Sequence, residues 1–260
     1  MSETSSVLLT SGTMGPAEWT EVAQRLTSSG LKLVVDTELV YDRGMGASAG
    51  TQLERLRQDA FWASTGVNHV DVAVGFNIGA GPAAAMVSHG LATSAVLIDP
   101  DLTALAMAHV DDDLDVFVPD DADLELALEI SERLVPFTEN LKHGPFTREM
   151  VDIFCGAFTG DRWRARQAEL VAPFLMNNVL VDRSSLPTED DLRASDWASA
   201  TNLEAVQVWF SAGRDRLAEY LRSRGFNVSV TSWGRSPWLE SPAELAAAVK
   251  REAVRARQLR

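Results

Sequence analysis

The sequence is poor in the residues that form disulfides, metal sites and catalytic bases. Among its 260 residues there are one cysteine, Cys155, and four histidines. A single cysteine cannot form an internal disulfide or a thiolate cluster, and such scarcity is typical of proteins from a reducing cytosol. No group of histidine, cysteine and carboxylate residues has the spacing of a metal site. We therefore expect a cytoplasmic protein that carries no metal.

Basic residues are also scarce. The 23 lysines and arginines are outnumbered by 37 aspartates and glutamates, which leaves a formal net charge of −14. Proteins bind nucleic acids and anionic membrane surfaces largely through lysine and arginine, so we expect neither partner. No apolar run reaches the roughly 18 residues that span a bilayer, and the first ten residues lack the basic start of a signal peptide. The glycines within residues 75–81 lack the spacing of a dinucleotide-binding turn, so no nucleotide cofactor is expected.

The sequence does contain an alternation of short β-branched runs and amphipathic helical patterns. This alternation predicts a parallel sheet with crossover helices on both faces. The apolar fraction of 46% is enough to fill the core of such a fold. We predict strands at residues 7–10, 32–35, 70–74, 94–98, 206–210 and 227–231. The expected fold class is therefore α/β, with a doubly wound, mostly parallel sheet of about six strands.

A long helical insert separates the fourth predicted strand from the fifth. Breaks in its helical pattern are expected at its glycines and prolines. These are Pro136, Gly144, Pro145, Gly156, Gly160, Pro173 and Pro187. An all-helical insert within a strand–helix series is typical of a cap over the edge of the sheet that binds ligands. We predict that residues 111–200 form this cap and that residues 1–110 and 201–260 form the core of the same structural domain.

Three local patterns, in chain order, resemble the α/β-hydrolase fold family. Residues 7–14 are similar to the family's first core strand and oxyanion loop. Residues 72–81 are similar to its nucleophile elbow, in which glycine, any residue, nucleophile, any residue, glycine make a sharp turn from strand to helix. Residues 211–215 resemble the acid turn, and residues 232–239 resemble the histidine loop. The order of the three patterns implies this fold, beginning at what would be the family's third strand.

The residues at the catalytic positions depart from the family pattern. In the elbow Gly75-Phe76-Asn77-Ile78-Gly79, the nucleophile position holds Asn77, whose carboxamide cannot form an acyl-enzyme. The histidine position holds Arg235, whose guanidinium stays protonated and cannot act as a general base. Only the acid position matches, with Asp215. The resemblance therefore implies a degenerate triad, and ordinary serine-hydrolase chemistry is excluded.

The rest of the implied site is suited to holding an anion. Arg235 can bind a carboxylate or enolate through two hydrogen bonds, and Asp215 is expected to form an ion pair with it. Backbone N–H groups at the start of the elbow helix and in the first loop would add donors. Beside the triad positions, the residues expected to bind ligand are Gly12, Thr13, Met14, Ile78, Trp233 and Trp238. We expect a small carboxylate- or carbonyl-bearing ligand under the cap, either only bound or converted by cyclisation, isomerisation or elimination.

Two alternatives stay open at this stage. The first is a hydrolase or esterase with displaced catalytic groups. Its candidates are the four histidines and an acid after the fourth strand: His69, His89, His109, His143 and Asp99. His69 precedes the third strand and His89 falls at the far end of the elbow helix, so both are more simply interpreted as ordinary histidines.

The second alternative is an inactive scaffold or partner subunit, including a homodimer, that works through its surface. The C-terminal helix concentrates five cations, which also stabilise a helix end without any partner. They are Lys250, Arg251, Arg255, Arg257 and Arg260. Cys155 lies in an apolar stretch and is expected to be a packed thiol, not a nucleophile.

Overall fold

The computed structural model describes residues 5–10, 15–36, 53–102, 105, 125, 128–129, 132–137, 145–176, 196–199 and 202–259. Six strands form one sheet in the order β2-β1-β3-β4-β5-β6, and every adjacent pair is parallel. The strands are β1 (Ser6–Thr10), β2 (Lys32–Val35), β3 (Val70–Phe76), β4 (Ala92–Ile98), β5 (Val206–Phe210) and β6 (Asn227–Val230). This architecture confirms the predicted fold class.

The central strands are apolar on both sides because helices cover both faces of the sheet. Every residue of β3 is buried, as expected for a parallel strand with packed layers above and below it. Alternate side chains belong to different layers: Val72 and Val74 pack into one apolar cluster, and Ala73 packs into the other. The sheet therefore separates two cores.

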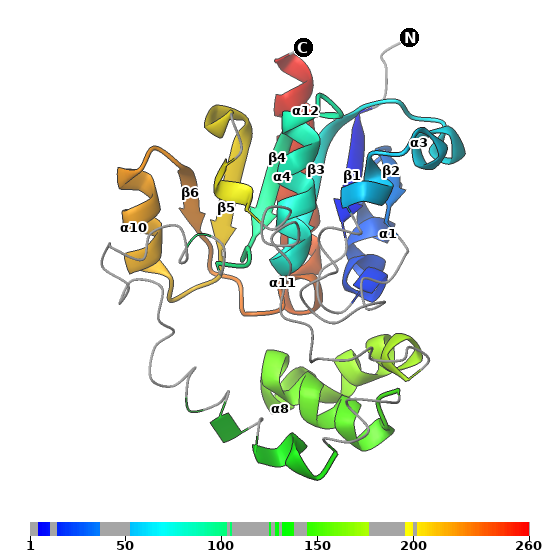
Figure 1. The fold of residues 1–260 in the computed structure, drawn as a ribbon, viewed down its shortest axis with the longest axis vertical. Helices are drawn as coiled ribbons and strands as arrows, with labels where there is room; N and C mark the ends of the chain where they lie inside the picture. Colours follow the sequence, from blue (N-terminus) through cyan, green and yellow to red (C-terminus); the bar gives the residue numbers. More distant parts are fainter. Residues whose placement is uncertain are drawn as a thin grey trace.

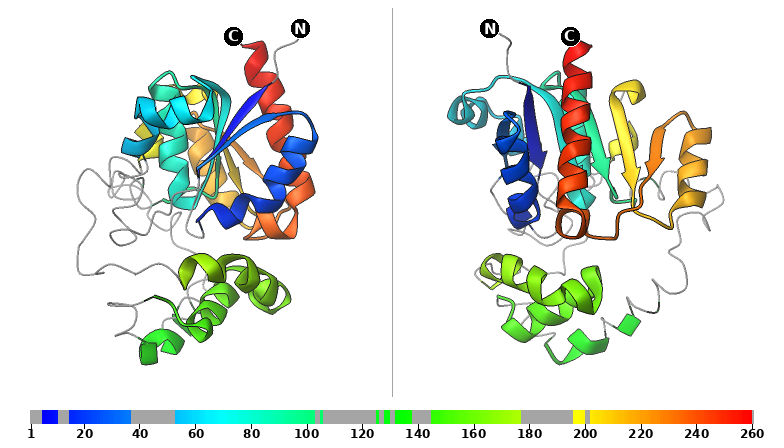
Figure 2. Two further views of the ribbon diagram at one scale, coloured as in Figure 1. Left: turned by 90° about the vertical axis from the view of Figure 1, so that its right-hand side faces the viewer. Right: turned by 180° about the vertical axis from the view of Figure 1, so that it is seen from behind.

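Two layers of helices complete the core. One face of the sheet is covered by α3 (Asp59–Thr65), α4 (Ala80–Ser88) and α10 (Asp215–Ser223). The other face is covered by α1 (Thr20–Ser28) and α12 (Pro242–Gln258). Figure 1 shows α4 in front of the sheet and α12 behind it, and Figure 2 shows the same layers from two further directions.

The predicted cap region contains α8 (Arg148–Leu175), which is interrupted at Gly160, where φ is 64°. Its two halves pack against each other through a third apolar cluster that includes Met150, Cys155 and Leu175. The predicted break at Gly160 is confirmed. The breaks predicted at Gly156 and Pro173 are wrong, because helical structure continues through both. Pro173 lies in the last turn of the helix, where a missing N–H donor and a ring clash disturb only the end of the hydrogen-bond ladder.

The helix α8 lies beyond the carboxyl edge of the sheet, on the side toward which the arrowheads of β5 and β6 point (Figure 1). It packs against the 3-10 turn η1 (Gly15–Trp19) and the short helix α11 (Pro237–Glu240). Ala17 of η1 is part of the apolar cluster of α8. Many residues of the predicted range 111–200 lie outside the described part of the chain, so the bounds of the cap stay a prediction. Within the described part, no helix has both the length and the apolar character needed to cross a membrane.

Candidate functional site

The register of the sheet brings three strand ends together at its carboxyl edge. Phe76 at the end of β3 pairs with Ile98 of β4, and Ile98 pairs with Trp209 of β5. The residues that follow these pairs, Asn77 and Asp99, are therefore neighbours. They are also the two residues other than glycine that have a positive φ in the described part of the chain, 49° and 40° respectively.

Asn77 occupies a sharp turn from strand to helix. It begins the 3-10 turn η2 (Asn77–Gly79), which leads directly into α4. Asparagine is one of the few side chains that tolerate the left-handed backbone region. The residue at the predicted nucleophile position thus has the backbone geometry of an elbow without a nucleophilic group.

Gly75, two residues before Asn77, is required by close packing of the backbone. A β-carbon on Gly75 would lie 2.2 Å from the carbonyl oxygen of Gly79. The buried hydroxyl of Thr10, at the end of β1, lies 2.8 Å from that carbonyl oxygen and 3.0 Å from the carbonyl oxygen of Val74. Thr10 thus fixes the turn to the neighbouring strand. Thr10 was predicted as the last residue of a strand, but no role at the site was expected of it, although its place at the strand end could have suggested one.

The start of the elbow helix offers backbone hydrogen-bond donors. Ile78 is half-buried in the turn, and the first N–H groups of a helical segment have no carbonyl partner within it. The aligned peptide dipoles give this end a partial positive charge. Arg235 is exposed in the loop between β6 and α11. The other predicted donors, in the loop Gly12–Thr13–Met14, lie outside the described residues.

The expected ion pair between Asp215 and Arg235 is not formed. Asp215 is exposed in the first turn of α10, and none of the ion pairs among the described residues joins it to Arg235. A carboxylate at this place stabilises the helix through the positive end of its dipole. Asp215 therefore has a sufficient structural role at the start of α10.

Asp99, and not Asp215, is the half-buried, hydrogen-bonded acid that follows β4 at this edge of the sheet. Its carboxylate accepts a hydrogen bond of 2.8 Å from the backbone N–H of Ser211, and its second oxygen is hydrogen-bonded to the Ser211 hydroxyl. The same hydroxyl lies 2.9 Å from the carbonyl oxygen of Gly234. Burial raises the pKa of Asp99, while the hydrogen bonds from Ser211 and the charge of Arg214 act in the opposite direction. This cluster ties the ends of β4 and β5 to the loop that carries Arg235.

Both predicted tryptophans belong to the core beneath the site. Trp238 packs edge-on against Phe76, with ring centroids 4.2 Å apart, and Trp233 packs edge-on against Trp209 at 5.8 Å. Their side chains are 3% and 7% exposed respectively. Trp238 thus packs against the residue that precedes Asn77, and the two tryptophans flank Arg235 in the sequence. Their contact with a ligand stays a prediction.

The two histidines in the described part of the chain lie away from the elbow. His69 immediately precedes β3, and His89 follows the last residue of α4. Both positions are at the amino edge of the sheet. Burial, and secondarily the charge of Arg57, lower the pKa of His89. His109 and His143 lie outside the described residues.

The single thiol has no sign of reactivity. Cys155 is buried in the cluster formed by the two halves of α8. Burial, with a smaller contribution from Asp152, raises its pKa to about 12. Because the thiolate is the nucleophilic form, a thiol with so high a pKa is inert at neutral pH.

As for metals, the described residues contain no group of three or more histidine, cysteine and carboxylate side chains that could bind an ion.

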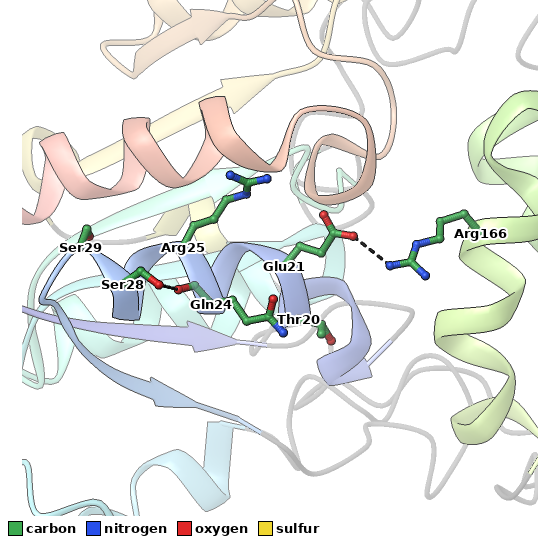
Figure 3. Close-up of a pocket in the computed structure, with 7 residues that line it drawn as sticks. All are labelled: Thr20, Glu21, Gln24, Arg25, Ser28, Ser29 and Arg166. Atoms are coloured by element: carbon green, nitrogen blue, oxygen red, sulfur yellow. Dashed lines mark hydrogen bonds and ion pairs between the residues drawn. The ribbon is translucent and has the colours of Figure 1, made fainter.

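A polar groove of about 650 Å³ lies between α1 and α8. Figure 3 shows its seven lining residues, with Arg166 of α8 reaching toward Glu21 of α1 at a distance of 3.2 Å. Among the described residues, the lining consists of Thr20, Glu21, Gln24, Arg25, Ser28, Ser29 and Arg166. None of the described residues predicted for the anion site lines this groove, so we interpret it as the open outer margin between cap and core.

Solved structures with the same architecture are α/β-hydrolase-fold enzymes. A bromoperoxidase from Bacillus anthracis has a TM-score of 0.58 and 14% identity over 96% of this chain and 92% of its own. The carboxylesterase CesB from Bacillus subtilis has a TM-score of 0.55 and 14% identity, with coverages of 96% and 84%. The haloalkane dehalogenase DbeA from Bradyrhizobium elkani USDA94 has a TM-score of 0.51 and 12% identity, with coverages of 100% and 92%.

These similarities define the class of fold. The chain has the α/β-hydrolase fold, as its elbow, its parallel sheet and its structural neighbours agree. No family model and no curated protein matches the sequence. At identities this low, the structural likeness establishes the fold and does not assign a reaction.

Proposed function

We propose that this protein binds a small carboxylate- or carbonyl-bearing ligand at a degenerate triad beneath the cap and does not form an acyl-enzyme. The observation that carries the proposal is Asn77, which takes the elbow position with a φ of 49°. A carboxamide has no ionisable group to serve as a nucleophile, but it can both donate and accept hydrogen bonds. The site would then recognise a polar group on its ligand instead of attacking it.

Arg235 supplies the positive charge in this proposal. A guanidinium offers a planar pair of donors that fits a carboxylate or an enolate, and it keeps its charge at any ordinary pH. The Ile78 N–H, and the predicted donors of Thr13 and Met14, would act on the same oxygen. Donors fixed around a carbonyl oxygen stabilise developing negative charge. Such a site is suited to cyclisation, isomerisation or elimination as well as to simple binding.

Displaced hydrolytic groups receive less support. The described histidines lie at the amino edge of the sheet, and Cys155 is an inert thiol. The carboxylate of Asp99 is hydrogen-bonded to Ser211 and is thereby part of the support of the loop. A scaffold or homodimer that acts only through its surface does not account for the elbow geometry at Asn77. From the single cysteine and the excess of acidic residues, we propose that the protein is cytoplasmic.

Calorimetric titration with benzoate and with 2-oxobutanoate tests the anion site. We expect both to bind, and we expect Arg235→Ala to weaken them by about tenfold or more, since a charge-assisted hydrogen bond contributes about 1.5–3 kcal/mol. Arg251→Ala removes an exposed arginine from α12 and serves as the matched control. Absence of binding, or equal affinities in wild type and Arg235→Ala, would contradict the proposal.

A panel of short-chain esters and lactones tests the absence of acyl-enzyme chemistry. We expect no hydrolysis by the wild type. The double variant Asn77→Ser with Arg235→His restores a hydroxyl and a base at the two positions and is the positive comparison. Ester hydrolysis by the wild type that is lost in Asp99→Ala would favour the displaced-group hydrolase instead.

A further inference from the structure

Gln167 is a buried carboxamide on the cap helix α8. Its side chain is 1% exposed. In the part of the chain that the structure describes, neither its amide nitrogen nor its amide oxygen has a hydrogen-bond partner. Buried polar groups are nearly always hydrogen-bonded, and each exception calls for a missing partner such as a ligand or a water molecule.

The neighbours of Gln167 place it at the junction between cap and core. Trp163 and Leu170 lie four residues before it and three residues after it, and both pack against the core cluster that contains Phe76 and Trp238. Residues at these spacings share one side of a helix. Leu170 also packs against the cap's own cluster. Gln167 thus lies where the two apolar clusters meet.

The core cluster at this junction extends to the elbow. Trp238 packs against Phe76, and Phe76 immediately precedes Asn77. Arg166, next to Gln167 in the sequence, forms an ion pair with Glu21 across the groove (Figure 3) and a second ion pair with Glu169 of its own helix. The charged side chain of Arg166 therefore lies at the open outer margin, while the amide of Gln167 is buried. A neutral amide in apolar surroundings recognises a neutral polar group.

We propose that Gln167 is the cap-side recognition group of the ligand and binds an amide-type edge. This inference rests on the anion site proposed above. A carboxamide presents an acceptor oxygen and a donor N–H side by side, and its complement is an N–H beside a C=O, as in a lactam, a primary amide or an imide. The ligand class is therefore a small apolar acid or carbonyl compound that also carries a lactam, amide or imide group.

Three acids of similar size test this class by calorimetry. The first, 6-oxo-1,6-dihydropyridine-3-carboxylate, carries a carboxylate and a lactam edge. Its N-methyl derivative has the same ring without the N–H donor, and benzoate has the carboxylate alone. We expect wild type to bind the lactam about tenfold more tightly than the N-methyl compound, which is the effect of a pair of hydrogen bonds in a buried site.

Gln167→Leu should abolish this preference and leave the affinity for benzoate unchanged. Gln24→Leu replaces an exposed glutamine of α1 and should preserve the preference. Equal affinities for the lactam and its N-methyl derivative in wild type, with benzoate bound, would overturn this inference and leave the anion site standing. If none of the three acids binds, both proposals fail.

Thermal unfolding without ligand provides a second readout. If Gln167 has no partner in the free protein, Gln167→Leu should raise the melting temperature, because an apolar group replaces an unpaired amide of similar size. A lowered melting temperature would show that the amide is hydrogen-bonded within the free protein, and it would overturn the inference even if the acids bind.

Discussion

The carboxylate of Asp99 and the hydroxyl of Ser211 are hydrogen-bonded at the carboxyl edge of the sheet. The hydroxyl has one proton but two acceptor oxygens close to it, one on Asp99 and one on Gly234. We predict that Asp99 is protonated in the folded state, so that the acid can donate to the Ser211 hydroxyl while that hydroxyl donates to the carbonyl of Gly234. The raised pKa that burial gives Asp99 acts in the same direction.

Asp99→Asn should therefore reproduce the protonated acid. The amide NH₂ can donate to the Ser211 hydroxyl, the amide oxygen can accept from the Ser211 N–H, and asparagine tolerates the positive φ of this position. Because the folded pKa is raised, the folded wild type binds the additional proton above the unfolded pKa near 3.8. Its unfolding free energy then falls as pH rises toward the folded pKa, by at most about 1.4 kcal/mol per pH unit.

Urea unfolding followed by tryptophan fluorescence at a series of pH values measures this effect. We expect the stability of Asp99→Asn relative to wild type to increase with pH across that window and then to level off. Asp99→Ala, which removes the bonds to Ser211, should be less stable than Asp99→Asn throughout. A wild type that gains stability over Asp99→Asn with rising pH would contradict a protonated Asp99.

Gly75 should tolerate no side chain. A β-carbon there would lie 2.2 Å from the Gly79 carbonyl oxygen, which belongs to the backbone and cannot move aside as a flexible side chain would. We expect Gly75→Ala to lower the unfolding free energy by about 3 kcal/mol, at the high end of overpacking effects. Gly90→Ala is the matched control, because Gly90 has a φ of 68° and no neighbouring atom within 4 Å. Gly90→Ala should lower the unfolding free energy by about 1 kcal/mol, because only the backbone conformation disfavours a side chain there. Similar losses in the two variants would contradict the close approach at the elbow.

The sheet and the elbow could be predicted from the sequence because their signals are local. Hydrophobic runs mark the strands, and Gly75 and Gly79 flank a turn whose geometry follows from their spacing. The role of Asp99 could not be predicted in this way, because it depends on the register between β4 and β5 and on a serine more than a hundred residues away. Asp215 fitted the family spacing, but a residue at a helix start can satisfy that pattern while remaining exposed. The missing partner of Gln167 is likewise a property of packing and not of its surrounding sequence.

Cys155 should report on opening of the cap cluster. With a pKa of about 12 and no exposure, the thiol should react with iodoacetamide at pH 8 about a thousandfold more slowly in the native protein than in urea. Mass spectrometry of quenched samples measures both rates in the same protein. Rapid modification under native conditions would mean that the two halves of α8 separate readily, and a ligand held beneath the cap should then slow the reaction.

The backbone at Asn77 should favour glycine over every other replacement. At a φ of 49°, an alanine β-carbon is strained, so Asn77→Ala should lose about 1 kcal/mol of unfolding free energy and Asn77→Val should lose more. Asn77→Gly avoids the strain and should be close to wild type in stability. Asn68 is an exposed asparagine without a positive φ, and there the order should reverse, with alanine at least as stable as glycine. If alanine and glycine are equivalent at position 77, the turn is not left-handed in solution. If Asn77→Gly also keeps the Arg235-dependent affinity for benzoate, the carboxamide contributes to the turn and not to anion binding.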